Sequence, residues 1–378
     1  MRTQRRTFRW EIVVLLLFAA ALLSGCSGGA RASTWTGLVI DDGVVYVADL
    51  THVRAFDAES GAQVWTFPRD ESGGGPFYTA TIQPGEALFV TSEEKASGLF
   101  SFAQARNVLR ALTIDPNDPD GRRELWAFDA AEGTYVSGGA VSDNLLVIGN
   151  GDGNVYALNT ESGAMVWTFT TENRIWAKPL VVSDTVYVSS LDHHLYALDV
   201  ENGRPRWEQP FQAGGAIAGQ PLVYDGLLYV GAFDNKVYAL QQEDGTVVWE
   251  AEGQNWFWGT PTTDGSAVYA ADVNGNVYAW DAATGSLVWD EHVDDLVHIG
   301  PALSQDHHIL VVAGSDGSLY GLDTSDGVVL WEQPGEGEIA SMVIDGDYVY
   351  ISRIASSDSV QAFYAENGRN LWTFSSDS

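Results

Sequence analysis

Cysteine and lysine are scarce in this chain. Its 378 residues include one cysteine, Cys26, and three lysines, at positions 95, 178 and 236. A single cysteine excludes a disulfide within the chain and a zinc site built from several thiolates. There are 51 acidic residues against 19 basic ones, giving a formal net charge of −32. That charge opposes binding to nucleic acid phosphates and lying flat on anionic lipid, so we expect no nucleic-acid partner.

A long apolar run is present near the N-terminus, but it is short for a membrane span. It covers residues 12–23 after four arginines and is followed by Leu23-Ser24-Gly25-Cys26. A helix needs about 20 apolar residues to cross a bilayer, whereas a basic segment, an apolar core and small residues are typical of a secretory signal. The segment resembles a lipoprotein signal. We expect a signal peptide over 1–25, lipidation of Cys26 and a tether over 26–33.

Two points about this leader stay open. Arg5-Arg6-Thr7-Phe8 also resembles a twin-arginine export signal, so the export pathway is not fixed. An ordinary cleaved signal with an incidental cysteine is the alternative to lipidation. About eight residues separate Cys26 from the first expected strand and reach at most ~28 Å when extended. The face on which the first strand begins should therefore lie near the membrane. The secretory leader predicts an extracytoplasmic chain, anchored to an envelope membrane only through its lipid.

Tryptophan, by contrast, recurs at an almost constant interval. The recurring residues are Trp65, Trp126, Trp167, Trp207, Trp249, Trp289, Trp331 and Trp372. From the second onward the gaps are 41, 40, 42, 40, 42 and 41 residues, while the first gap is 61. A period of ~40–45 residues with several strands per unit is typical of a β-propeller blade. One repeat therefore carries an insertion of about twenty residues.

Each repeat contains four short Val-, Tyr- and Leu-rich runs, which we term strands A to D in chain order. Gly, Asp and Asn separate them, with Asp-Gly pairs such as Asp152-Gly153 between strands B and C. These are strand and tight-hairpin signals. The sequence predicts an all-β fold, an eight-bladed β-propeller of four-stranded antiparallel blades over 34–378. We expect the eight tryptophans to dock neighbouring blades, each with one N–H for a carbonyl, and the ring to close by side-to-side packing.

The most regular segment joins strands C and D. Ala55, Asp57, Gly61 and Trp65 are spaced by two, four and four residues, and 197, 199, 203 and 207 repeat the pattern. This motif resembles the pyrroloquinoline-quinone-type propeller repeat. The resemblance covers about residues 34–378 and implies one of two classes: quinoprotein dehydrogenases, or non-enzymatic lipoproteins similar to BamB, the outer-membrane protein assembly factor. The fold alone does not choose between them.

Aromatic and polar residues precede strand A in several repeats. Because the A strands surround the channel, we expect them to gather at its mouth as a ligand or partner site. The candidates are Trp35, Arg174, Trp176, Lys178, Gln220, Trp256, Trp258 and His298. Arg174 and Lys178 are rare positive charges placed where an acidic group could bind. The alternative is that the aromatic residues only pack between blades.

The insertion in repeat two is a second candidate. Residues 92–108 are predicted to lengthen its B–C loop, and Leu99, Phe100 and Phe102 form an apolar run in it. Long loops in compact folds are often functional, so these residues are candidates for contact with a partner. The alternative is that the loop packs on its own propeller.

The sequence carries little sign of catalysis. It has no Cys-Cys pair such as quinoproteins place beside the quinone, and the A-strand starts of repeats three to seven have no acidic residue except Asp295. Adjacent histidines at 193–194 and 307–308 diverge in turns, and Asp-Gly turns lack the closing Glu of a calcium loop. We expect no catalytic residue, no metal and neither quinone nor calcium.

The expected function is therefore binding. The sequence indicates a monomeric, lipid-anchored scaffold similar to the BamB factors, with a protein partner in or near the membrane. Two alternatives remain: a quinone-dependent dehydrogenase, and a propeller that binds a small solute or glycan through Trp176, Trp256 and Trp258.

Overall fold

A computed structural model describes residues 37–49, 51–68, 76–94, 106–114, 124–293, 296–335, 337–354 and 358–375. The expected signal peptide, Cys26, the tether and Trp35 lie outside these residues, as do Leu99, Phe100 and Phe102. The described residues all belong to one compact unit. Within the described residues, no helix has the length and apolar character needed to cross a membrane.

The described strands form eight four-stranded sheets, each antiparallel throughout. Blades 1 to 4 contain β1 (Leu38–Asp41), β2 (Val44–Ala48), β3 (Val53–Asp57), β4 (Gln63–Phe67); β5 (Phe77–Gln83), β6 (Ala87–Glu94), β7 (Arg106–Thr113), β8 (Glu124–Phe128); β9 (Ala140–Ser142), β10 (Leu145–Gly149), β11 (Asn154–Asn159), β12 (Met165–Thr170); and β13 (Leu180–Val182), β14 (Thr185–Ser189), β15 (His194–Asp199), β16 (Phe211–Gln212). Blades 5 to 8 contain β17 (Leu222–Tyr224), β18 (Leu227–Gly231), β19 (Lys236–Gln241), β20 (Val247–Glu252); β21 (Thr262–Thr263), β22 (Ala267–Ala271), β23 (Asn276–Asp281), β24 (Leu287–His292); β25 (Ala302–Leu303), β26 (Ile309–Ala313), β27 (Leu319–Asp323), β28 (Val329–Gln333); and β29 (Ile339–Asp345), β30 (Tyr348–Arg353), β31 (Asp358–Tyr364), β32 (Asn370–Ser375).

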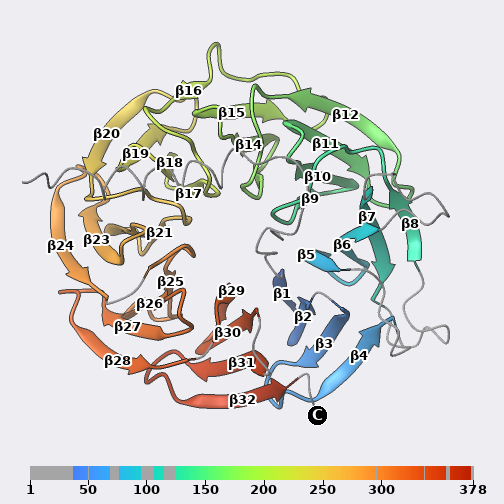
Figure 1. Ribbon diagram of the computed structural model, residues 1–378. Coiled ribbons are helices and arrows are strands. Elements are labelled where there is room, and N and C mark those ends of the chain that lie inside the picture. The colour runs from blue at the N-terminus through green and yellow to red at the C-terminus, as the bar shows by residue number, and fades with distance from the viewer. Residues whose placement is uncertain are drawn as a thin grey trace, which may run out of the picture. The chain divides into compact units, whose positions relative to one another are not determined.

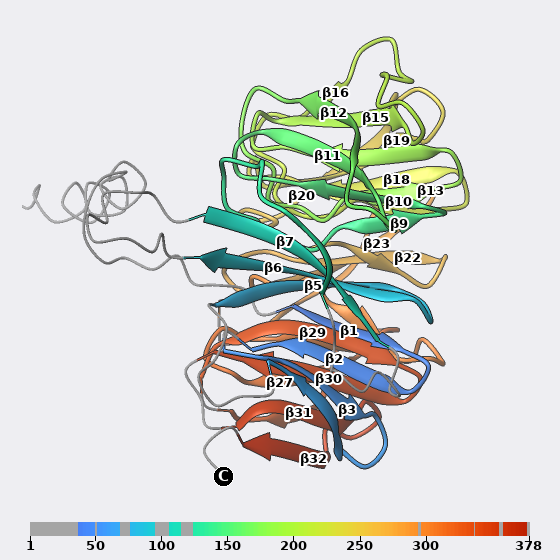
Figure 2. The same ribbon diagram turned by 90° about the vertical axis from the view of Figure 1, so that its right-hand side faces the viewer.

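The eight sheets are arranged in a ring around a central axis (Figure 1). In each blade strand A lies nearest this axis and strand D, such as β12 or β24, lies on the outside (Figure 1). Figure 2 shows the same blades from the side. The prediction of an eight-bladed β-propeller is confirmed. The core lies between blades: β10 and β11 bury Val147 and Val155 against Val186 and Leu198 of the next blade.

The recurring tryptophans join each blade to its neighbour. Seven indoles donate a hydrogen bond to a backbone carbonyl 33–35 residues later or, at the closure, near the start of the ring; the acceptors of Trp126, Trp167, Trp207, Trp249, Trp289, Trp331 and Trp372 are Thr160, Val200, Gln242, Ala282, Thr324, Ala365 and Ala58. Trp65 packs on Tyr46, with ring centroids 5.9 Å apart. The bond from Trp372 to Ala58, 2.9 Å long, joins blade 8 to blade 1. The ring therefore closes without a strand shared between its ends.

The remaining motif positions make room for this contact. Ala239 pairs with Trp249 across β19 and β20, and the register then shifts by one residue. Gly285, in the next blade, has a φ of +71°, and a Cβ placed there would lie 2.7 Å from Trp249 Cδ2. A side chain at Gly285 would thus be both strained and too close to the indole. The motif Asp281 closes the same turn, because its Oδ1 accepts the Thr284 N–H at 2.8 Å.

Two boundaries differ from the sequence prediction. The insertion was expected to lengthen a loop over 92–108, but β6 and β7 continue into it, with Ser92 paired to Val108 and Glu94 to Arg106. Ser92 and Val108 are buried, so the pairing extends while side chains remain covered. In blade 4 the outer strand is reduced to β16 and one isolated bridge at Pro205. Proline has no N–H for the ladder, which explains the interruption.

Candidate binding site in the central channel

The loops that run from strand D of one blade to strand A of the next lead into the channel. In blades 3 to 7 the loop bonds near its start to the B–C turn of the blade it enters. The Arg174 carbonyl, for example, accepts the Leu191 N–H at 3.0 Å, and the Trp256 carbonyl accepts the Val273 N–H at 2.9 Å. We name the face that carries these D–A loops and B–C turns the loop face. The same bond recurs along the chain, so residues at equal places in the loops are structurally equivalent.

In blades 3, 4 and 5 an aspartate of the B–C turn holds the incoming loop, an arrangement we term the turn latch. Asp234 accepts the Gly214 N–H at 2.7 Å, the Lys236 N–H at 3.2 Å and the Tyr238 hydroxyl at 2.6 Å. Asp152 and Asp192 accept the same three kinds of bond in blades 3 and 4. These turns, which the sequence identified only as hairpins, therefore fix the path of the loops into the channel.

The latch also changes the pKa of the tyrosines that donate to it. Burial raises the pKa of Tyr238, and the hydrogen bond it donates to the Asp234 carboxylate raises it further. Burial and a latch aspartate raise the pKa of Tyr156 and Tyr196 in the same way. The latch tyrosines therefore stay neutral, and remain donors, well above the pH at which free tyrosine ionises.

Successive residues of a loop face different surroundings. Arg174 and Trp256 are exposed on the loop face, and the residues that follow them, Ile175 and Phe257, are buried between blades. The next residues, Trp176 and Trp258, line a cavity in the channel. Alternation along an extended segment thus sends neighbouring side chains to opposite sides.

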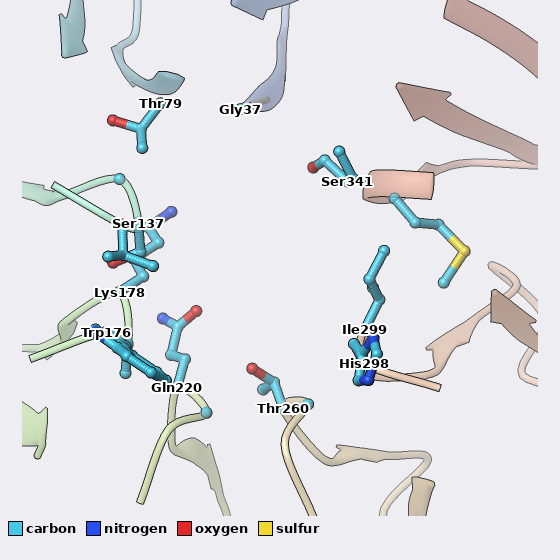
Figure 3. Close-up of a pocket in the computed structure, with 18 of the residues that line it drawn as sticks. Gly37, Thr79, Ser137, Trp176, Lys178, Gln220, Thr260, His298, Ile299 and Ser341 are labelled. Carbon is cyan, nitrogen blue, oxygen red and sulfur yellow. The ribbon is translucent and has the colours of Figure 1, made fainter. Parts of the chain in front are cut away.

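The cavity has a volume of 270 Å³ and is lined by residues from all eight blades. Trp176, Lys178, Gln220, Trp258 and His298 belong to its lining, so five of the eight side chains singled out in the sequence gather here. Figure 3 shows Trp176, Lys178 and Gln220 on one side, with His298 and Ile299 opposite. Hydroxyl groups of Thr79, Ser137, Thr260 and Ser341 complete the polar lining.

Arg174 and Trp256 are not part of this lining and lie apart from the five candidates that are. Residues two positions apart point to the same side of an extended segment, so the difference comes from position along the loop. Arg174 and Trp256 lie two residues earlier, where the loop bonds to the B–C turn at the loop face. The Trp256 ring stacks instead on Phe233, with centroids 5.1 Å apart and an interplanar angle of 13°. Phe233 also contacts Trp258 at 5.2 Å, so an aromatic path leads from the cavity to the loop face.

Phe233 and the turn latches were missed in the sequence. Both leave a signal there: Asp152, Asp192 and Asp234 each stand four residues before a tyrosine, and Phe233 is the only aromatic residue at its place in the B–C turns of blades 3 to 7, among Gly151, Leu191, Val273 and Ser315. The channel hydroxyls gave no such signal, because threonine and serine are common throughout the strands.

The electrostatics of the cavity centre on Lys178. Among the lining residues that the structure describes, no aspartate or glutamate occurs. Burial lowers the pKa of the Lys178 ammonium below its ordinary value. Calcium prefers carboxylate and carbonyl oxygens, so this donor set does not fit the calcium-quinone site implied by the quinoprotein resemblance. The described residues also contain no group of three or more His, Cys, Asp or Glu side chains arranged to hold a metal.

The ring, its docking tryptophans and its channel define an eight-bladed propeller of the pyrroloquinoline-quinone-like repeat class. A family model described as "Outer membrane protein assembly factor BamB" matches residues 110–252 and 253–376, which is most of the propeller. The chain belongs to this family.

Individual relatives are more distant. The chain is 30% identical to the Escherichia coli BamB over 262 residues, covering 62% of this chain and 64% of the relative. It is 26% identical to BamB of Yersinia pestis over 290 residues, 74% of this chain and 61% of the relative. A tetrathionate hydrolase of Acidithiobacillus ferrooxidans is 25% identical over 304 residues, 68% of this chain and 52% of the relative. The chain thus spans between about half and two thirds of these relatives.

Solved structures share the architecture. BamB from Moraxella catarrhalis superposes with a TM-score of 0.71 at 18% identity, covering 89% of this chain and 95% of that one. A computationally designed protein, Ika8, gives 0.69 at 15% identity, with 89% and 98% covered. At these identities the likeness shows the fold alone, and the fold does not imply a function.

Proposed function

We propose that this chain is a non-enzymatic, lipid-anchored scaffold outside the cytoplasm that binds a protein partner in or near the membrane. Family membership supports a scaffold of the BamB type. The leader sequence ending at Cys26 supports export and lipidation. In this proposal the chain acts as a monomer and touches the membrane only through its lipid.

The observation that carries the partner site is an exposed tryptophan on the loop face. Trp256 is 47% exposed although it stacks on Phe233. Leu296, at the equivalent place one blade later, is 50% exposed, and Arg174 is exposed at the equivalent place two blades earlier. Tryptophan and arginine dominate the energetics of protein interfaces, and large exposed apolar groups on one face favour a contact surface. Trp256, Leu296 and Arg174 form the proposed partner site.

Absence of catalysis is part of the proposal. The hydrolase relative leaves a second candidate, an enzyme, but none of the cavity hydroxyls is paired with a described histidine or carboxylate as an activated nucleophile would be. Purified protein is expected to leave tetrathionate unchanged. If the protein instead converts tetrathionate, and substitution of Lys178 or His298 abolishes that turnover, the chain is an enzyme and the scaffold proposal is refuted.

The partner is tested by crosslinking and co-purification from native membranes with Cys26 intact. Recovery of a stoichiometric membrane protein supports the scaffold, and recovery of none contradicts it. The anchor is tested separately with Cys26→Ser, which we expect to move from the membrane fraction to the soluble extracytoplasmic fraction. An unchanged membrane fraction would contradict anchoring through Cys26.

A further inference from the structure

We propose that the channel cavity is a binding site for a small organic acid with one negative charge and an apolar or planar body. The ligand's carboxylate lies at Lys178 and its body against Trp176 and Trp258. This site is distinct from the proposed partner site, because Arg174, Trp256 and Leu296 are absent from the lining of the cavity.

The charge of the ligand follows from Lys178. It is the one Lys or Arg on the described lining, which contains neither Asp nor Glu, and no ion pair involves it among the described residues. Lys236 shows the contrast, since on the surface its ammonium pairs with Glu250 at 2.6 Å. A half-buried lysine without a carboxylate, in a chain of net charge −32, leaves one positive charge for an anion to neutralise. One ammonium matches one carboxylate.

Neutral polar groups complete the part of the cavity around Lys178, where the ligand's carboxylate is proposed to bind. Ser137 and Gln220 lie on the same side of the cavity as Lys178, and Thr260 follows next to Gln220 (Figure 3). The Gln220 side-chain amide donates to the Pro179 carbonyl at 3.5 Å, which holds this side chain beside the lysine. Hydroxyl and amide donors next to an ammonium suit a carboxylate, whose two oxygens accept about four hydrogen bonds.

The apolar end of the site is a tryptophan wall. Trp176 and Trp258 come from the loops entering blades 4 and 6, yet their rings stack with centroids 5.7 Å apart and an interplanar angle of 21°. They meet because the equivalent residue of blade 5, between them, is the small Ala218. His298 extends the wall, with its ring 5.6 Å from Trp258. Broad aromatic faces beside a few polar groups are typical of small-ligand pockets.

The size of the cavity selects the ligand class. At 270 Å³ it is just below the usual range of about 300–1,000 Å³ for ligand pockets. A benzoate-sized acid fits, whereas a folded protein segment does not. Burial lowers the pKa of Lys178, and a bound carboxylate opposes that effect, so affinity should fall as alkaline pH removes the proton from the lysine.

Calorimetric titration of the full chain, freed of its lipid by Cys26→Ser, tests the proposal with three acids: benzoate, phenylacetate and 4-methylpentanoate. Each is compared with its uncharged amide. We expect at least one acid to bind at least about tenfold more tightly than its amide, the ratio that a 1.4 kcal/mol charge contribution gives. Failure of all three acids to bind at millimolar concentration would overturn the proposal.

Variants locate the site. Lys178→Met should bring the acid-to-amide ratio close to one, while the matched surface variant Lys236→Met should keep it. Thermal melting of both variants controls for folding, and Lys178→Gln serves if Lys178→Met does not fold. A ratio retained in both Lys178 variants would overturn the assignment. If no acid binds and a crosslinked membrane protein shields Lys178 instead, the carboxylate belongs to that protein; the small-acid site is then refuted while the scaffold stands.

Discussion

Two sets of tryptophans in this propeller differ in how they relate to the repeat. Those at the docking position recur in every blade, and seven of them donate to a carbonyl of the next blade. Trp176, Trp256 and Trp258 occur in only two of the D–A loops and face the cavity or the solvent. A residue required at every junction is explained by the ring itself. Residues that break the repeat are not needed for closure, so they are where binding is to be sought.

The largest expected difference between the sets is in stability. Trp249 is buried at a blade junction and bonds to the Ala282 carbonyl at 2.9 Å. Trp249→Ala should lower the free energy of unfolding by about 3–5 kcal/mol, as truncation of a buried tryptophan does. Trp258→Ala should lower it by only about 1–2 kcal/mol, because Trp258 is half-buried. Denaturant unfolding of both variants checks this, and equal losses would erase the distinction.

Removing a turn latch should have an intermediate effect. Asp234→Ala deprives the Gly214 and Lys236 amides and the Tyr238 hydroxyl of their acceptor. We expect a loss of about 1–3 kcal/mol, the cost of leaving partly buried donors unsatisfied. Asp326→Ala is the control, because Asp326 accepts the Val328 N–H at 3.1 Å on an exposed C–D turn, where water can replace the acceptor, and the change should cost less than about 0.5 kcal/mol. A latch variant as stable as the control would show that the loops need no latch.

The latch tyrosines predict a pH dependence of stability. The pKa values of Tyr156, Tyr196 and Tyr238 are raised in the folded protein. Burial also raises the pKa of Tyr350, which is not a latch tyrosine, to about 12. Above the ordinary tyrosine pKa of about 10, the unfolded chain loses protons that the folded chain keeps. Stability present below pH 10 should therefore decline as the pH rises from about 10 to 12.

Thermal melting across this range tests the pH dependence. In Tyr238→Phe the stability should fall less steeply with rising pH, since the substitution removes one tyrosine whose pKa is raised by folding. An unchanged slope in that variant would contradict the assignment to the latch.

The smallest expected effect concerns a single exposed charge. Arg174→Glu should reduce capture of the membrane partner by about threefold to tenfold, which corresponds to the roughly 0.6–1.4 kcal/mol of an exposed ion pair. Arg204→Glu, exposed on the C–D turn of blade 4, serves as a charge-matched control. Quantitative crosslinking yields decide, and equal losses in both variants would point to net charge and not to a site.

The sequence predicted the ring better than the site. A fixed tryptophan period determines the number of blades and the place of the docking residue in each repeat, although Trp207 lies outside the shortened outer strand of blade 4. Whether a loop residue faces the channel depends on the path of the loop, which the latch aspartates set in three dimensions. Arg174 and Trp176 therefore looked alike in the sequence although only Trp176 lines the cavity. Phe233 was missed because its contacts come from the neighbouring loop.

The central claim is that departures from the repeat carry the binding function. It is tested most directly by capture of the membrane partner with Trp256→Ser and with Met165→Ser, a matched variant that removes an exposed apolar side chain, 55% exposed, from the outer strand β12. Both variants should melt close to the unsubstituted protein. The account predicts that Trp256→Ser loses at least about tenfold of the capture, as an interface hot spot would, while Met165→Ser keeps it. Full capture by Trp256→Ser would contradict the account.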